Sequence, residues 1–214
     1  MTDTDTDAET DTDAEIDTAA LDRAASAVAD GDLVVYPTET VYGLGADATN
    51  PDAVERVFDC KGRDRDKPLS VGVADVETAR RYARLTDRDE RFVREFLPGP
   101  VTVVVEADPS LPDALTAGRD RVGVRIPDHE VALALLRAAA PLPVTATSAN
   151  VSGTGSVRRV ADLSPRVRDA CAVVLDVGET PGGESTVVDP GRGVIHRRGP
   201  RADEIEAWLA EADD

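Results

Sequence analysis

The amino-acid sequence predicts a single α/β domain built on a twisted, mixed β-sheet flanked by helices. Short buried-strand patterns alternate with helical patterns along most of the chain, and no internal repeat interrupts them. Setting aside an acidic stretch at residues 1–17 leaves 197 of the 214 residues, enough for one sizeable core. Interspersed strands and helices are typical of a layered α/β architecture.

Helical spacing and capping residues place the first elements. Apolar residues recur at helical spacing over 16–30, Gly31 ends that helix, and 33–36 forms a short buried strand. Asn50 and Pro51 begin a second helix as N-cap and first-turn proline, and the basic segment that follows lies at its C-terminal end.

The later elements continue the alternation. The pattern predicts strands over 69–73, 101–106, 122–126, 143–146, 173–175, 186–188 and 194–196, and helices over 75–84, 87–96, from 128 or 129 to about 139, and over 202–211. Segments 147–156 and 178–185, rich in Gly, Pro and Ser, are predicted loops, where functional residues concentrate.

The charge of the chain is unevenly distributed. The formal net charge is −18, and residues 1–17 carry eight acidic residues and no basic one. We predict that 1–17 is a disordered tail, because it has too little apolar surface to offset its ordering entropy, and that 18–212 is the folded domain. The acidity, the scarce lysine and the few aromatics indicate a halophilic protein. Alternatively, the charge repels nucleic acid outright.

Composition also excludes several classes of protein. Cys60 and Cys171 are distant in sequence and belong to no CxxC or Cys/His cluster, so we expect free thiols in a reducing cytoplasm and no zinc site. No apolar run approaches 18 residues, and the acidic N-terminus does not resemble a signal peptide, so no membrane association is expected.

The two lysines of the chain mark its most unusual segment. Both lie within seven residues, Lys61 to Lys67, with Arg63 and Arg65 between them, whereas every other cation of the chain is arginine. Lysine offers a compact point charge suited to phosphate or carboxylate. Adjacent cations repel one another unless an anion joins them, which favours an anion site. The alternative is pairing with the interleaved aspartates, or, for Lys67, a solvated surface charge.

Three further clusters follow strand ends or precede strands, and each has a bland alternative. The first is Thr38-Glu39-Thr40, which taken alone is best interpreted as a polar turn. The second is Thr147-Ser148-Ala149-Asn150 with Ser152-Gly153, which suits binding of an anion or is a capped turn. The third is Gly182-Gly183-Glu184-Ser185 with the following strand, Arg197 and Gly199, which permits close backbone approach or is a turn with surface arginines. The sequence contains no Walker loop, no G-x-G-x-x-G fingerprint, no serine elbow and no metal-ligand spacing.

In this order and spacing, the segments closely resemble the YrdC/Sua5 family, the L-threonylcarbamoyladenylate synthases. The resemblance covers about residues 18–210 and rests on 37–45, Lys61-Gly-Arg63 with 68–69, 99–102, 124–127 with His129, 147–150 with 152–153, 185–189, and Arg197 with Gly199. It implies a YrdC-like fold around a positively charged cavity, in the short form that lacks the C-terminal Sua5 domain.

The resemblance also implies a reaction. Members of this nucleotidyltransferase family join L-threonine, bicarbonate or CO2, and ATP with Mg²⁺ into threonylcarbamoyl-AMP and pyrophosphate. The product feeds the N6-threonylcarbamoyladenosine (t6A) modification of tRNA, which a separate transferase complex completes. Direct tRNA binding is compatible with the resemblance but not required by it.

Family roles can be carried over residue by residue. The resemblance assigns Lys61 and Arg63 as electrostatic catalytic residues, without a covalent nucleophile and without a protein ligand to metal. ATP would be bound by Lys61, Arg63, Lys67, Asn150 and Arg197, and L-threonine by Thr40, Arg125, Ser148 and Ser185.

The chain departs from the family pattern at three positions. Asp64 replaces a frequent proline, Lys67 replaces Asn or His, and Gly72 replaces a histidine that some relatives carry. These departures keep alternatives open: a YciO-type paralogue acting as an RNA- or nucleotide-binding protein, or a domain of hydrogenase maturation. The latter domains belong to longer, cysteine-rich chains, and an RNA-binding module usually carries a basic-aromatic stripe that this chain lacks.

Overall fold

The structure is a computed structural model that describes residues 17–211, and its regular elements alternate along the chain. The helices are α1 (Thr18–Ala29), α2 (Pro51–Lys61), α3 (Val76–Ala79), α4 (Asp87–Phe96), α5 (Asp113–Thr116), α6 (Glu130–Ala139), α7 (Pro165–Ala170) and α8 (Ala202–Glu211), with 3-10 turns at Val160–Asp162 and Pro190–Arg192. The strands are β1 (Leu33–Tyr36), β2 (Gly43–Gly45), β3 (Ser70–Gly72), β4 (Ala83–Arg84), β5 (Val101–Ala107), β6 (Arg121–Arg125), β7 (Val144–Ser148), β8 (Cys171–Val174), β9 (Thr186–Asp189) and β10 (Val194–Arg197).

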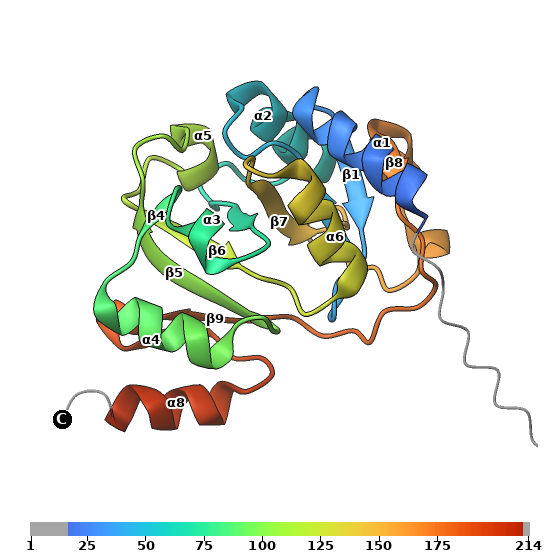
Figure 1. The fold of residues 1–214 in the computed structure, drawn as a ribbon. Helices are drawn as coiled ribbons and strands as arrows, with labels where there is room; N and C mark the ends of the chain where they lie inside the picture. The colour runs from blue at the N-terminus through green and yellow to red at the C-terminus, as the bar shows by residue number, and fades with distance from the viewer. Residues whose placement is uncertain (1–16, 212–214) are drawn as a thin grey trace, which may run out of the picture.

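The strands form one mixed sheet in the order β10-β9-β5-β6-β3-β7-β2-β1-β8, and β4 pairs with β5 (Figure 1). Three pairs are parallel, β1 with β8, β3 with β6 and β5 with β9, and the other pairs are antiparallel. Helices flank the sheet: α1 packs against α6, and α2 packs against α5 and α7. The predicted mixed α/β fold is therefore confirmed.

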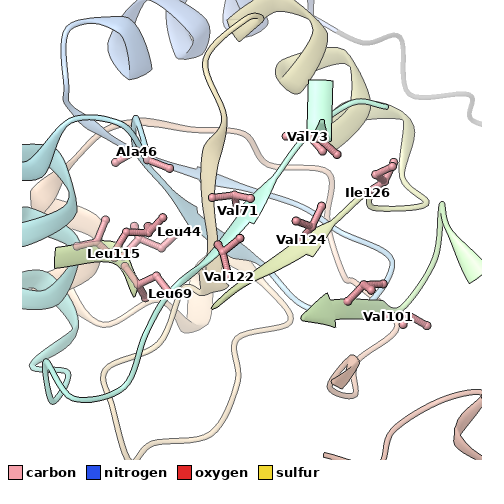
Figure 2. Close-up of a cluster of buried hydrophobic side chains, with 14 of the residues drawn as sticks. Leu44, Ala46, Leu69, Val71, Val73, Val101, Leu115, Val122, Val124 and Ile126 are labelled. Carbon is pink, nitrogen blue, oxygen red and sulfur yellow. The ribbon is translucent and has the colours of Figure 1, made fainter. Parts of the chain in front are cut away.

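Strand alternation divides the centre of the sheet into an apolar face and a polar face. Along β6, Val122 and Val124 are buried in the core, and they lie close to Val71, Leu69 and Leu115 of neighbouring segments (Figure 2). The residues between them turn to the opposite face, because successive side chains of a strand point to opposite sides. This second face carries the cavity described below.

The α2 helix has the predicted N-cap, and the structure adds a glycine cap at its C-terminal end. The Asn50 side chain accepts from the backbone N–H groups of Asp52 and Ala53, and Pro51 occupies the first turn. Gly62 ends the helix in the left-handed conformation, with φ of 57°. The left-handed glycine cap stops the helix at Lys61 and turns the chain toward the cavity.

Five short elements differ from the sequence prediction. The predicted helix over 75–84 is a single turn, α3, followed by β4, because residues 83–84 pair with 106–107 of β5. The pattern also missed β2, α5 and α7, which are only three to six residues long. Pairing with a long neighbouring strand overrides local helix propensity at 83–84.

The helix α8 lies beside α4 (Figure 1), and aromatic side chains pack between the two helices. Phe92 and Phe96 stack with ring centroids 4.5 Å apart, and Trp208 meets Phe92 edge-on at 5.0 Å. The Arg201 guanidinium lies 4.6 Å from the Phe96 ring centre. Aromatic rings favour offset-stacked and edge-on arrangements such as these. The helix α8 is therefore part of the packed domain.

The beginning of the chain is described only from Asp17 onward. Asp17 is the N-cap of α1, and its carboxylate accepts from the backbone N–H of Ala20 at 3.1 Å. Residues 1–16 of the predicted tail, and residue 212 of the predicted domain, lie outside the described residues, so disorder of the tail stays a prediction.

Candidate active site

A cavity of about 660 Å³ lies over the polar face of the sheet. It is bounded by strand residues and by the segments that follow α2 and β7. All nine residues that the sequence analysis assigned to substrates line it: Thr40, Lys61, Arg63, Lys67, Arg125, Ser148, Asn150, Ser185 and Arg197. Segments separated by more than 150 residues thus meet at one site.

Lys61 lies deepest among the cations. Its side chain is only 2% exposed, and its ammonium donates to the backbone carbonyls of Ser148 and Asn150, the latter at 2.7 Å. Burial, and then the nearby Arg63 charge, lower the pKa of Lys61 from its ordinary value of 10.5 to about 8. An ammonium has three N–H donors, so one remains for a ligand.

The segment after β7 is fastened to the end of α2. The Ser152 N–H donates to the Lys61 carbonyl at 2.8 Å, and the Ser148 hydroxyl bonds the Asn150 side-chain oxygen. The Asn150 amide in turn donates to the carbonyls of Val151 and Thr154, the latter at 2.7 Å. Ser148, assigned to threonine, and Asn150, assigned to ATP, are therefore direct neighbours.

Arg63 and Lys67 lie on the loop that leaves α2. Arg63 donates from Nε to the Lys67 carbonyl at 3.0 Å and from Nη2 to the Pro68 carbonyl at 3.1 Å. Burial, and next the charge of Arg197, lower the pKa of Arg63. Lys67 is exposed. The interleaved-aspartate alternative is wrong for Arg65, which instead pairs with Glu55 and Asp59 on α2.

Arg125 is held by a carboxylate and a hydroxyl. Its Nη2 donates to Glu39 at 3.0 Å and to the Thr40 hydroxyl at 2.8 Å. The Thr40 hydroxyl also contacts the Thr38 hydroxyl at 3.0 Å, and Thr38 donates to the Val41 carbonyl. The segment after β1 therefore acts as a structured support for Arg125.

Ser185 and Arg197 form the third polar group of the wall. Arg197 donates from Nη2 to the Ser185 hydroxyl at 3.0 Å, and that hydroxyl contacts Thr102 at 2.9 Å. A register shift between Ile195 and Arg197 of β10 marks an irregularity that helps to direct Arg197 to the cavity. The structure thus places Ser185 beside Arg197, whereas Ser185 makes no hydrogen bond to Arg125, its proposed companion at the threonine carboxylate.

Two glycine segments permit these approaches. Gly182 has φ of 96°, and its N–H donates to the Thr40 carbonyl. A Cβ at Gly199 would lie 2.4 Å from the Glu184 carbonyl, so a side chain there would push the end of β10 away from Ser185. The predicted close backbone approach is confirmed at Gly182, whereas a Cβ at Gly183 would meet nothing within 4 Å; the tight contact at Gly199 was not predicted.

Sequence reasoning missed three charged groups at the site. Arg119 and Arg121 line the cavity, and Glu39 supports Arg125 from behind. The signal was present, because residues 121, 123 and 125 alternate with the core valines of β6. Arg121 pairs with the fully buried carboxylate of Asp189 at 2.5 Å.

The departures from the family pattern occupy different environments. Asp64 lines the cavity, and its carboxylate accepts from the Asp66 N–H at 3.1 Å. Gly72 lies in β3 between Arg125 of β6 and Val144 of β7, and it is not among the residues that line the cavity.

Positive charge exceeds negative charge among the lining residues. The lining carboxylates are Asp64 and Glu184, and the lining cations are Lys61, Arg63, Lys67, Arg119, Arg121, Arg125 and Arg197. Within residues 17–211, no group of three or more His, Cys, Asp or Glu side chains could hold a metal ion. Across the same residues, no helix has the length and apolar character needed to cross a membrane.

The fold and the cavity together define a class: an α/β protein whose cation-lined, hydroxyl-rich cavity is suited to small anionic ligands. The particular family follows from comparison with known proteins. The chain belongs to the Sua5/YciO/YrdC family, whose model, described as telomere recombination, matches residues 26–199.

Several similar proteins are named threonylcarbamoyl-AMP synthase. The chain is 40% identical over 168 residues to the threonylcarbamoyl-AMP synthase of Pyrococcus abyssi, covering 78% of this chain and 49% of the relative. It is 39% identical over 172 residues to that of Bacillus subtilis, again 49% of the relative, and 35% identical over 210 residues to that of Homo sapiens, 91% of this chain and 72% of the relative. The chain spans about half the length of the first two relatives.

Solved structures agree with this membership. Pyrococcus abyssi Sua5 complexed with L-threonine superposes with a TM-score of 0.80 at 38% identity, over 84% of this chain and 54% of that one. Escherichia coli YciO gives a TM-score of 0.75 at 22% identity, over 84% of this chain and 89% of that one, which shows the common fold alone.

Proposed function

We propose that this chain is an L-threonylcarbamoyladenylate synthase, which condenses L-threonine, bicarbonate or CO2, and ATP to threonylcarbamoyl-AMP and pyrophosphate. The observation that carries the proposal is the convergence of all nine assigned residues on one cavity lined mostly by cations. The names of the relatives, and the threonine complex of one of them, support the same substrates.

The chemistry suits a site without a nucleophilic side chain. The threonine amine adds to CO2 and loses a proton, which gives an N-carboxylate. A carboxylate oxygen then attacks the α-phosphorus of ATP, the α–β P–O bond breaks, and pyrophosphate leaves with its electron pair. The substrates supply both nucleophile and leaving group, so the protein must align two anions and neutralise charge. A well-placed donor contributes about 3–4 kcal/mol to such a step.

The geometry supports a division of labour along the cavity. Arg125, fixed by Glu39 and Thr40, suits the carboxylate of threonine. Lys61, with one free N–H donor beside the carbonyls of Ser148 and Asn150, suits the α-phosphate at the reacting centre. Arg63 and Arg197 lie on the phosphate side of it.

Magnesium would accompany the nucleotide. The lining carboxylates, Asp64 and Glu184, are too few to form a full oxygen shell. Mg²⁺ usually keeps several waters and takes phosphate oxygens as ligands, so we propose that it is held mainly by ATP. The proposed product then passes to a separate threonylcarbamoyl transferase complex in the cytoplasm, for t6A synthesis.

The direct test is pyrophosphate release from ATP at high KCl with Mg²⁺ and bicarbonate, with and without L-threonine. We expect threonine-dependent release, with threonylcarbamoyl-AMP detected by mass. Folded protein that releases no pyrophosphate in response to threonine would contradict the proposal and favour the YciO-type alternative.

A further inference from the structure

The cavity contains cations that no assigned substrate contact accounts for. Arg119 is exposed at the cavity, just before β6, and neither the sequence motifs nor the family resemblance gave it a role. It lines the cavity together with Arg121 and Arg125 of β6. The side chain therefore lies along the polar face that carries the site.

Arg119 and Arg63 donate hydrogen bonds to the backbone of the same short segment, residues 66–68. Arg119 donates from Nη2 to the Asp66 carbonyl at 2.9 Å, and Arg63 donates to the next two carbonyls, of Lys67 and Pro68. Two guanidinium groups thus meet at three consecutive carbonyls. A guanidinium has five N–H donors, and Arg119 uses only one nitrogen in these bonds.

The charges at this end of the cavity are not neutralised by the protein. Among residues 17–211, no carboxylate oxygen lies within 4.0 Å of the charged nitrogens of Arg63, Lys67 or Arg119. Arg121, by contrast, is paired with Asp189. Neighbouring like charges are costly unless an anion joins them, and on a chain of net charge −18 such an unpaired group stands out.

Burial orders these cations from inside to outside. Lys61 is buried, Arg63 is half-buried, and Lys67 and Arg119 are exposed. The reacting α-phosphate must lie at the deep end, beside threonine. The two phosphates beyond it then extend toward the exposed end.

Resting on the proposed function, we propose that Arg119, together with Lys67, binds the two terminal phosphates of ATP and the pyrophosphate that they become. Arg119 is then a specificity-determining residue for a triphosphate over a monophosphate. It also gives the leaving group a charged contact at the rim of the cavity, from which it can exchange with solvent.

The test is equilibrium binding of three probes, inorganic pyrophosphate, ATP and AMP, to the full chain with Mg²⁺ at the KCl concentration used for turnover. The variant is Arg119→Gln, whose amide can still donate to the Asp66 carbonyl. We expect it to weaken pyrophosphate and ATP by about tenfold, the loss of one charged hydrogen-bonding partner, and AMP by less than about twofold. The matched control is Arg91→Gln, which removes an exposed arginine from α4.

The variant Arg119→Lys tests whether the positive charge of Arg119, or only its hydrogen bond to the Asp66 carbonyl, is needed for binding. We expect this variant to recover most of the pyrophosphate affinity, because it restores the positive charge. Equal losses for AMP and pyrophosphate in Arg119→Gln, no difference from the Arg91→Gln control, or a folded Arg119→Lys without recovery would each overturn the inference. If the wild type bound AMP and threonine normally in those cases, the proposed function would stand; a wild type that bound none of the ligands would refute both.

Discussion

Two groups of cations line the same cavity but are balanced in different ways. Arg121, Arg125 and Arg197 each form an ion pair with a carboxylate of the protein, which is Asp189 at 2.5 Å, Glu39 at 3.0 Å and Glu184 at 3.6 Å respectively. We call these the balanced arginines. Lys61, Arg63, Lys67 and Arg119, the unbalanced cations, have no carboxylate within 4.0 Å among the described residues, and the side-chain donors of three of them bond backbone carbonyls.

The difference separates geometry from charge. A guanidinium paired with a carboxylate is held in one orientation, and its positive charge is largely offset by its partner. This arrangement suits the orientation of a zwitterion such as threonine. A cation held only by carbonyl dipoles keeps its full charge, which suits a polyphosphate. Both kinds can therefore work in one cavity, which would keep the proposed triphosphate and amino-acid subsites apart.

The largest expected effect comes from removing the innermost unbalanced cations. If the proposed function holds, Lys61→Ala and Arg63→Ala should each lower the turnover number by at least about 100-fold, because the proposal puts these charges at the reacting centre. Steady-state kinetics with a thermal melt would measure this. Turnover near that of the wild type in either variant would show that the anion site is wrongly placed.

A smaller effect should follow from disturbing a balanced arginine. Glu39→Gln keeps an acceptor for Arg125 but removes the charge that fixes it, so we expect the KM for threonine to rise about tenfold. The KM for ATP should change by less than about twofold. Glu95→Gln, an exposed change on α4, is the matched control; equal shifts in both Michaelis constants would mean that the two groups do not act separately.

The smallest effect is a pH dependence that belongs to the unbalanced group. Because the pKa of Lys61 is lowered to about 8, AMP affinity should fall as pH rises above 8, by at most about tenfold per unit for one proton. The free energy of unfolding should rise with pH between about 8 and 10.5, because in that range Lys61 binds its proton mainly in the unfolded state. Titration of AMP from pH 7 to 9.5 measures the first trend, and a flat profile would contradict it.

The sequence predicted the parts of the fold that local chemistry determines. The N-cap of α2, the valine-rich strands and the closing helix are confirmed, because each depends on neighbours in the chain. β2 escaped notice because Gly43 and Gly45 read as turn residues. In the structure they are strand residues, and a Cβ at Gly43 would lie 2.8 Å from the Tyr36 ring. That constraint comes from a partner strand and is invisible in the local pattern.

The sequence predicted which residues line the site but not which contacts they make with one another. Motifs brought nine residues to one cavity, whereas the roles of Glu39 and Arg119 appear only in contacts that span 86 and 53 positions. Glu39 stands in the Thr38-Glu39-Thr40 cluster but was given no role there, and Arg119 stands in no motif. Their roles depend on which backbone or side chain the folded sheet brings beside them, and a single sequence does not contain that information.

The packing of α8 against α4 also provides a natural spectroscopic probe. Trp208 is the only tryptophan in the chain, it meets Phe92 and Phe96, and it is not among the residues that line the cavity. Intrinsic fluorescence excited at the indole band therefore reports undocking of the C-terminal helix rather than ligand occupancy. A change in this fluorescence can thus be assigned to loss of packing between α8 and α4, and not to loss of substrate binding.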